Sequence, residues 1–174
     1  MSIEVEVQQA LSADAVDSLP GDEEIRCWVQ TALLVAGYGA ADNRQVVVRI
    51  VDREEVTLLN RDYRHKDAVT NVLSFPFEVP QGIPGEELLP LGDIVVCAAV
   101  VAQEALEQGK PALHHWAHMI IHGALHLLGY DHMSEAEASE MEALEIRTLA
   151  ELGFPDPYVV DDQNLETNTS VKTS

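Results

Sequence analysis

Apolar positions recur along the chain at two periods, and each period predicts a type of secondary structure. Residues 3–7 alternate apolar and acidic side chains, which predicts a strand with one face in solvent. Residues 46–51 are nearly all apolar and β-branched, which is typical of a central strand. The same criteria predict strands over 69–77 and 93–98.

Apolar residues three and four positions apart predict helices over 23–35, 99–108, 112–128 and 134–152. A further helix is expected after Asp52, because Asp52 and Glu55 resemble a capping box. Ser134 and Glu137 repeat this pattern before the last helix. In that helix we expect these side chains to point inward: Met141, Leu144, Ile146 and Leu149.

The elements predict an α+β fold in which a small mixed β-sheet packs with helices. The chain has 174 residues, 47% of them apolar, which suffices for one substantial core. We assign residues 1–158 to a single domain and expect the polar tail at 159–174 to be disordered. The stretch 79–90 holds three prolines and two glycines and is predicted to be a surface loop.

The chain lacks the sequence features of secreted and membrane proteins. Its start, MSIEVEVQQA, has no basic segment followed by an apolar run, and no apolar stretch is long enough to cross a bilayer. The two cysteines, Cys27 and Cys97, are far apart and form no C-x-x-C pair, so no disulfide framework is indicated. We expect a cytoplasmic protein with no membrane partner.

Charge argues against non-specific binding to nucleic acid. Thirty acidic residues against ten basic ones give a formal net charge of -20. Six of the ten cations nevertheless fall in one stretch: Arg44, Arg49, Arg53, Arg61, Arg64 and Lys66. They form either a local basic surface or ion pairs with neighbouring carboxylates, and the sequence leaves both readings open.

The most informative pattern is a set of three histidines. His122, His126 and His132 stand at relative positions 0, 4 and 10, with Gly129 at position 7. His122 and His126 share one face of a helix, and glycine can take the left-handed conformation that ends a helix. His132 can then approach the same ion. Three protein ligands leave a coordination position for water, which is typical of catalytic zinc. We therefore predict one zinc ion per chain, held by a helix buried in the core, and hydrolytic chemistry.

This H-x3-H-x5-H spacing is metzincin-like, with one departure. Gly123 stands where a zinc protease carries the glutamate that acts as its general base. The departure favours a hydrolytic substrate other than a peptide. Two alternatives stay open: a metalloprotease-like hydrolase with a displaced general base, and a non-enzymatic protein whose metal is structural.

Two polar residues near the histidines are further candidates. His118 precedes His122 by four residues, but a shift of about 40° per four-residue step turns it away from an ion held further along. We expect it to contact substrate or to support a ligand ring. Asp131 precedes His132 and is either a base, a support for a ligand ring, or a cap of the turn, the last being favoured.

Four stretches of the chain are recognisable. They are LNRDYRHKDAVTNVLSFPFE, LGDIVVC, HWAHMIIHGALHLLGYDH and EMEALE. Together they resemble the bacterial YbeY family of ribosomal-RNA maturation endoribonucleases, over roughly residues 45–158. One departure is Ala68-Val69, where the family often has a residue followed by proline.

The resemblance implies a zinc-dependent, single-strand-specific endoribonuclease that matures the 3′ end of small-subunit (16S) rRNA and acts in ribosome quality control. It implies His122, His126 and His132 as zinc ligands and Arg64 as a catalytic residue facing the cleft. A guanidinium can hold a phosphate and stabilise the charge that develops on it. The alternative for Arg64 is a surface ion pair with Asp62 or Asp67. The implied partners are rRNA, the small ribosomal subunit, and ribosomal proteins or assembly factors, without a nucleotide cofactor. With this resemblance, the non-enzymatic alternative is a ribosome-assembly factor whose metal is structural.

Overall fold

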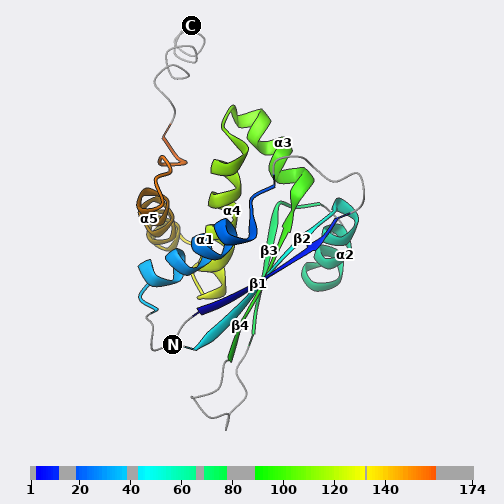
Figure 1. Cartoon of the computed structure of the whole chain (residues 1–174), viewed down its shortest axis with the longest axis horizontal. Helices are drawn as coiled ribbons and strands as arrows, with labels where there is room; N and C mark the ends of the chain where they lie inside the picture. Colours follow the sequence, from blue (N-terminus) through cyan, green and yellow to red (C-terminus); the bar gives the residue numbers. More distant parts are fainter. Residues whose placement is uncertain are drawn as a thin grey trace, which may run out of the picture.

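The computed structural model describes residues 3–11, 19–38, 43–65, 69–77, 89–131 and 133–159. Within these ranges the chain forms four strands and five helices (Figure 1). In order they are β1 (Ile3–Ala10), α1 (Asp22–Val35), β2 (Arg44–Val51), α2 (Arg53–Arg64), β3 (Val72–Pro76), β4 (Leu89–Cys97), α3 (Ala98–Gln108), α4 (Ala112–Leu127) and α5 (Glu135–Glu151). The predicted α+β fold with a small mixed sheet is confirmed.

The strands form one sheet in the order β1-β2-β4-β3. β1, β2 and β4 are parallel, while β3 runs antiparallel to β4 at the edge of the sheet. Parallel neighbours need long crossover connections, and α1 supplies one between β1 and β2. Among the described strands, β3 therefore has a neighbour on one side only, and it also packs against α4.

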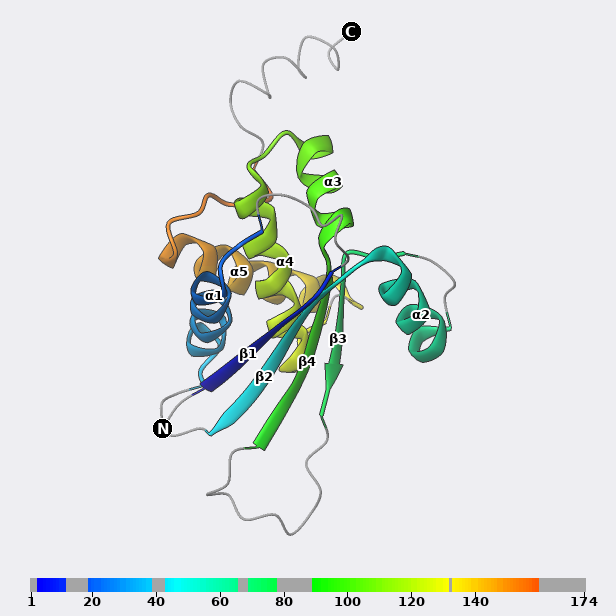
Figure 2. The same cartoon turned by 45° about the vertical axis from the view of Figure 1, so that its right-hand side comes forward.

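Helices cover the two faces of the sheet unequally. Figure 2 shows α1, α4 and α5 on one side of the sheet and α2 on the other, where the first residues of α3 also pack. In β2 the side chains alternate: Val46, Val48 and Ile50 point to the three-helix side, whereas Val51 joins the smaller cluster under α2. The main core thus lies between the sheet and α1, α4 and α5.

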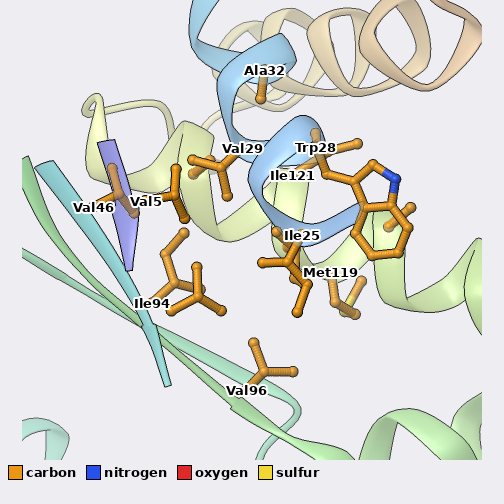
Figure 3. Close-up of a cluster of buried hydrophobic side chains, with 14 of the residues drawn as sticks. Val5, Ile25, Trp28, Val29, Ala32, Val46, Ile94, Val96, Met119 and Ile121 are labelled. Atoms are coloured by element: carbon orange, nitrogen blue, oxygen red, sulfur yellow. The ribbon is translucent and has the colours of Figure 1, made fainter. Parts of the chain in front are cut away.

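Interlocking apolar side chains fill this core. Ile25 and Val29 of α1 point toward Ile94 and Val96 of β4 (Figure 3). Ile121 of α4, fully buried, belongs to the same cluster. Burying side chains of this size contributes about 1.5–3 kcal/mol each, so α4 is fixed firmly against the sheet. The prediction that the histidine-bearing helix is buried in the core is confirmed.

Two strand boundaries differ from those predicted. The strand predicted over 93–98 begins earlier, at Leu89. Pro90 can lie within this strand because the pairing of β2 with β4 is irregular there, between Gln45 and Val46. The strand predicted over 69–77 is shorter, Val72–Pro76. Of the loop predicted at 79–90, residues 79–88 lie outside the described residues, as do residues 160–174 of the predicted tail.

The prediction that Asp52 and Glu55 form a capping box is wrong. Asp52 is the N-cap residue of α2, but its side chain makes no capping hydrogen bond. Glu55 instead accepts from Arg49, with Oε1 3.0 Å from Nη2, because Arg49 projects from β2 on the side that α2 covers. Ser134 does cap α5, accepting from the backbone N–H of Glu137 at 3.1 Å.

The inner face of α5 also differs from the prediction. Met141 and Leu149 are buried as predicted, but Leu144 is half-buried, and the remaining inward positions belong to Glu145 and Thr148. Ile146 is likewise half-buried. Positions 141, 145, 148 and 149 follow the helical repeat closely, so the geometry places a carboxylate inside the core.

Among the described helices, none combines the length and apolar character that a membrane span requires.

Candidate metal centre

The backbone of α4 sets the direction of its histidines. Pro111 is the N-cap residue and Leu128 the C-cap residue, and Gly129 follows with a φ of 97°. The predicted left-handed conformation of Gly129 at the end of the helix is thereby confirmed. The helix therefore delivers His122 and His126 from a rigid, buried backbone just before the chain turns.

His122 and His126 point toward a common location. Their Nε2 atoms lie 3.1 Å apart, and both side chains are half-buried. Two nitrogens that each lie about 2.0–2.1 Å from one tetrahedral zinc ion are separated by about 3.3–3.4 Å. The spacing of the two nitrogens is therefore close to that of two ligands of a single ion.

Glu145 of α5 determines the tautomer of His122. Its carboxylate Oε2 accepts a short hydrogen bond from His122 Nδ1. A carboxylate without a proton can only accept, so Nδ1 carries a hydrogen, and in the neutral ring Nε2 then presents its lone pair to the common location. Ligand histidines in metal sites are commonly held by a carboxylate in this way.

Glu145 is fully buried and still ionised. Burial raises the pKa of its carboxyl group, but the hydrogen bonds from His118 and His122 outweigh this and lower the pKa to about 2. His118 Nε2 lies 3.0 Å from Oε1, and the phenol of Tyr158 donates to the same oxygen. A buried charge is tolerated only with such partners. The His118 ring thus bonds to Glu145, the residue that holds His122, and its Nε2 atom does not face the common location.

Gly123 lies where the sheet presses on α4. A Cβ atom built there would lie 2.8 Å from Cγ2 of Ile94 and 3.2 Å from Cγ2 of Val72, closer than carbon atoms normally approach. The hydroxyl of Ser74 in β3 donates to the carbonyl oxygen of Gly123 at 2.8 Å. The packing explains why no glutamate, or any larger residue, follows His122.

The third predicted ligand is not placed. His132 lies outside the described residues, and no group of three or more histidine, cysteine, aspartate or glutamate side chains suited to a metal occurs within the described ranges. Asp131 is half-buried, two residues after Gly129. The roles predicted for His132 and Asp131 therefore stay predictions.

Arg64 lies on a different helix from the histidines. It occupies the last turn of α2 and is exposed. Its neighbour Tyr63 is 66% exposed and contacts Phe75 of β3 edge to face, with ring centroids 5.3 Å apart. β3 links the two regions, because Phe75 contacts α2 while the preceding residue, Ser74, binds α4.

Neither Glu145 nor Tyr158 stands out in the sequence as a site residue. A signal for Glu145 exists, since it is an acidic residue at the same helical face as Met141 and Leu149. Tyr158 follows the end of α5 in an irregular segment, and sequence spacing gives no sign of its position.

Comparison with known proteins places this fold and site in context. A protein from Thermotoga maritima, known from a solution structure, matches with a TM-score of 0.52 and 22% identity, covering 91% of this chain and 99% of its own. This likeness defines the class of α+β fold. The sequence model of the family described as endoribonuclease YbeY matches residues 12–153, and the chain belongs to that family, as its motifs predicted.

Two relatives carry the same description. The endoribonuclease YbeY of Alcanivorax borkumensis is 56% identical over 155 residues, which are 88% of this chain and 85% of that relative. The endoribonuclease YbeY of Halorhodospira halophila is 54% identical over 153 residues, which are 88% of this chain and 97% of that relative. The likeness therefore extends over most of each sequence.

Proposed function

We propose that this protein is a zinc-dependent endoribonuclease that cuts single-stranded RNA at a centre formed by His122, His126 and His132. Membership in the endoribonuclease YbeY family supports the reaction class. The observation that carries the location is the 3.1 Å separation of the His122 and His126 Nε2 atoms. The bond from His122 Nδ1 to Glu145 adds to it, because it fixes the tautomer that a ligand needs.

The described donor atoms fit a zinc ion. Neutral imidazole nitrogens suit zinc, and two of them already face one location from a rigid helix. Bound there with His132 as third ligand, the ion would polarise a phosphodiester and lower the pKa of a water molecule, which is what hydrolysis at neutral pH requires. The protein's own residues would orient the ligand ring of His122, leave no room for a side chain at position 123, and hold the substrate.

The packing at Gly123 supports a nuclease over a peptidase. A zinc peptidase of the H-E-x-x-H type needs a glutamate directly after the first histidine, to accept a proton from water. Here Ile94 and Val72 occupy the space that such a side chain needs. A phosphodiester of RNA offers another route, since the 2′-hydroxyl of the ribose can itself attack the phosphorus. The nucleophile is thus either water or that hydroxyl.

Arg64 and Tyr63 supply the contacts we propose for single-stranded RNA. The exposed guanidinium of Arg64 can hold a phosphate by two parallel hydrogen bonds. The exposed ring of Tyr63 offers a face on which a base can stack. Because β3 contacts both α2 and α4, we propose that the RNA strand crosses the β3 edge between Arg64 and the histidines.

The formal net charge of -20 bears on how the protein reaches its substrate. Such a charge repels bare RNA over distances beyond the site itself. We propose that the substrate is the 3′ end of 16S rRNA within the small ribosomal subunit, with basic ribosomal proteins or assembly factors as docking partners in the cytoplasm. Roles in rRNA processing, ribosome biogenesis and ribosome quality control would follow from that location.

Cleavage of a labelled single-stranded RNA by the purified chain tests the proposal. We expect His126→Ala and metal-stripped protein to be inactive, with activity returning to the stripped wild type when zinc is restored. Arg64→Ala should lose about 10²–10³-fold, the usual effect of removing one group that stabilises developing charge. Arg61→Ala is the matched control, because Arg61 is also exposed on α2 and its cation already pairs with Asp62.

Substrate variants separate the remaining alternatives. A duplex RNA should be cut poorly, and a single 2′-deoxy substitution at the cleaved position should block the reaction only if the 2′-hydroxyl attacks. Equal activity in every protein sample would indicate a contaminant and contradict the assignment. A folded wild type that binds zinc but cuts neither free RNA nor small subunits would favour a non-enzymatic assembly factor.

A further inference from the structure

The segment that follows α5 returns to the metal centre. Phe154 anchors it, with its backbone N–H donating to the carbonyl of Leu149 at 2.8 Å and its ring packing edge to face on Trp28. Four residues later, the backbone N–H of Tyr158 donates to the Asp156 carboxylate at 2.8 Å. The Phe154 contacts hold the segment against α1 and α5, and the bond between Tyr158 and Asp156 closes a local turn that follows.

The phenol of Tyr158 contacts a fully buried carboxylate, although the residue as a whole is 46% exposed. Its hydroxyl donates to Oε1 of Glu145 and lies 3.2 Å from Nε2 of His118. The ring packs edge to face on the His118 ring, with centroids 5.4 Å apart. Burial, and then the hydrogen bond to Glu145, raise the pKa of the phenol, so it stays protonated and acts as a donor.

The two oxygens of Glu145 have separate tasks. Oε1 accepts from Tyr158 and His118, and Oε2 accepts from the Nδ1 atom of His122. Holding Oε1 on one side fixes the plane of the carboxylate, and this aims Oε2 at His122. A purely structural core position would hold an apolar residue at lower cost, because burying a carboxylate costs several kcal/mol before its partners compensate.

We infer that Tyr158 and His118 are positioning residues for the metal centre, which act through Glu145 on the ligand His122. The inference rests on the function proposed above. It extends the centre beyond the region matched by the family's sequence model, which ends at residue 153. Removing a group that orients a ligand histidine typically weakens metal binding by about 10–100-fold.

Zinc affinity of the full chain, measured by competition with a chromophoric chelator, tests the inference. Tyr158→Phe keeps the ring and removes the hydroxyl, and we expect about tenfold weaker zinc binding. Glu145→Gln keeps the shape and should weaken binding more, toward about 100-fold. Tyr38→Phe is the matched control, since Tyr38 is a half-buried tyrosine that packs on the same core, and its zinc affinity should equal that of the wild type.

A second readout reports on the ligand ring without any metal. Nitrogen chemical shifts of the His122 ring in zinc-free protein should indicate a proton on Nδ1 in the wild type and a mixture of tautomers in Glu145→Gln. At saturating zinc, the RNA cleavage rate of Tyr158→Phe should recover to near the wild-type value, because a positioning residue does not touch the substrate. A rate that stays low at saturating zinc would overturn the positioning role.

The outcomes separate this inference from the proposed function. Folded Tyr158→Phe and Glu145→Gln proteins with wild-type zinc affinity would overturn the inference and leave the nuclease proposal standing. A wild type that does not bind zinc would contradict the proposed function, while the tautomer measurement would still decide whether Glu145 fixes the His122 ring. Circular dichroism of each variant confirms that the comparison is made between folded proteins.

Discussion

Two of the histidine–carboxylate pairs on helix α4, one near each end, look alike in isolation. Near its start, His115 Nε2 lies 2.8 Å from Oε1 of Glu104 in α3. Two turns later, His122 Nδ1 bonds to Glu145 in α5. Both pairs link α4 to a neighbouring helix, and both carboxylates have a further partner. A histidine bonded to a carboxylate is therefore not by itself a sign of a metal site.

The other nitrogen of each ring makes the difference. The Nδ1 atom of His115 is buried and has no hydrogen-bond partner among the described residues. The Nε2 atom of His122 instead faces the Nε2 atom of His126 at 3.1 Å, at the half-buried end of the helix. Glu104 also accepts from the Asn71 side chain at 3.1 Å, which ties α3 to the start of β3. The first pair joins elements, and the second orients a ring toward a shared location.

Removing one histidine from each region gives the largest expected contrast. We expect His126→Ala to weaken zinc binding well beyond the roughly 10–100-fold cost of losing a supporting group, because it removes a direct ligand. His115→Ala should leave zinc affinity unchanged and lower the free energy of unfolding by about 1–3 kcal/mol, since it leaves a cavity and an unmet hydrogen bond. Chelator competition and urea unfolding measure the two effects. Similar loss of zinc affinity in both variants would erase the distinction.

Sequence patterns predicted the part of this comparison that depends on local spacing. The four-residue interval between His122 and His126 fixes their shared helical face, and Gly129 takes the left-handed conformation predicted for it. The order of the elements and the mixed sheet were likewise predicted from periodicity, because amphipathic helices and strands must bury their apolar faces.

The carboxylate partners depend on tertiary packing and escaped prediction. Glu104 and Glu145 lie on helices whose orientation toward α4 no local pattern encodes. Leu144 and Ile146 are more apolar than Glu145, so a ranking by hydrophobicity places them inside, whereas the helical repeat places Glu145 there. Arg64 illustrates the converse: its motif predicts a role in the cleft that the described contacts do not test.

A substitution at Gly123, one residue after His122, tests whether tight packing against the sheet helps to place the His122 ring. In Gly123→Ala the added methyl group meets Ile94 and Val72 of the sheet. Overpacking costs about 1–3 kcal/mol, and better helix propensity returns about 1 kcal/mol, so we expect a net loss of about 1–2 kcal/mol in unfolding free energy. The clash should also shift His122 and weaken zinc binding.

A matched control isolates the propensity contribution to the Gly123 result. Ala143→Gly, at an exposed position of α5, should destabilise by about 1 kcal/mol without any effect on zinc. A Gly123→Ala protein more stable than the wild type would mean that α4 does not press on the sheet as described, and the packing explanation for the missing glutamate would fail with it.

The smallest expected effect concerns pH and the His115 pair. Burial lowers the pKa of His115 below its usual value of 6.5, and the bond to Glu104 offsets this only in part. A histidine with a lowered pKa in the folded state binds its proton more readily when unfolded, so acid favours unfolding. The stability that the neutral His115 contributes is fully present above a pH of about 6.5, the pKa of histidine in the unfolded chain. It is lost as the pH falls below that pKa toward the lower pKa of His115 in the folded protein.

Comparing zinc-free wild type with His115→Gln isolates this contribution, because the other titrating groups are common to both proteins. Glutamine can still donate to Glu104 but does not titrate. The difference in unfolding free energy should be constant above pH 7 and should shift in favour of the variant as the pH falls below about 6.5, by at most about 1.4 kcal/mol per pH unit. Urea unfolding at several pH values measures it. A difference that does not vary with pH would mean that His115 is not held neutral by burial, and the contrast between the two ends of α4 would then lose its electrostatic basis.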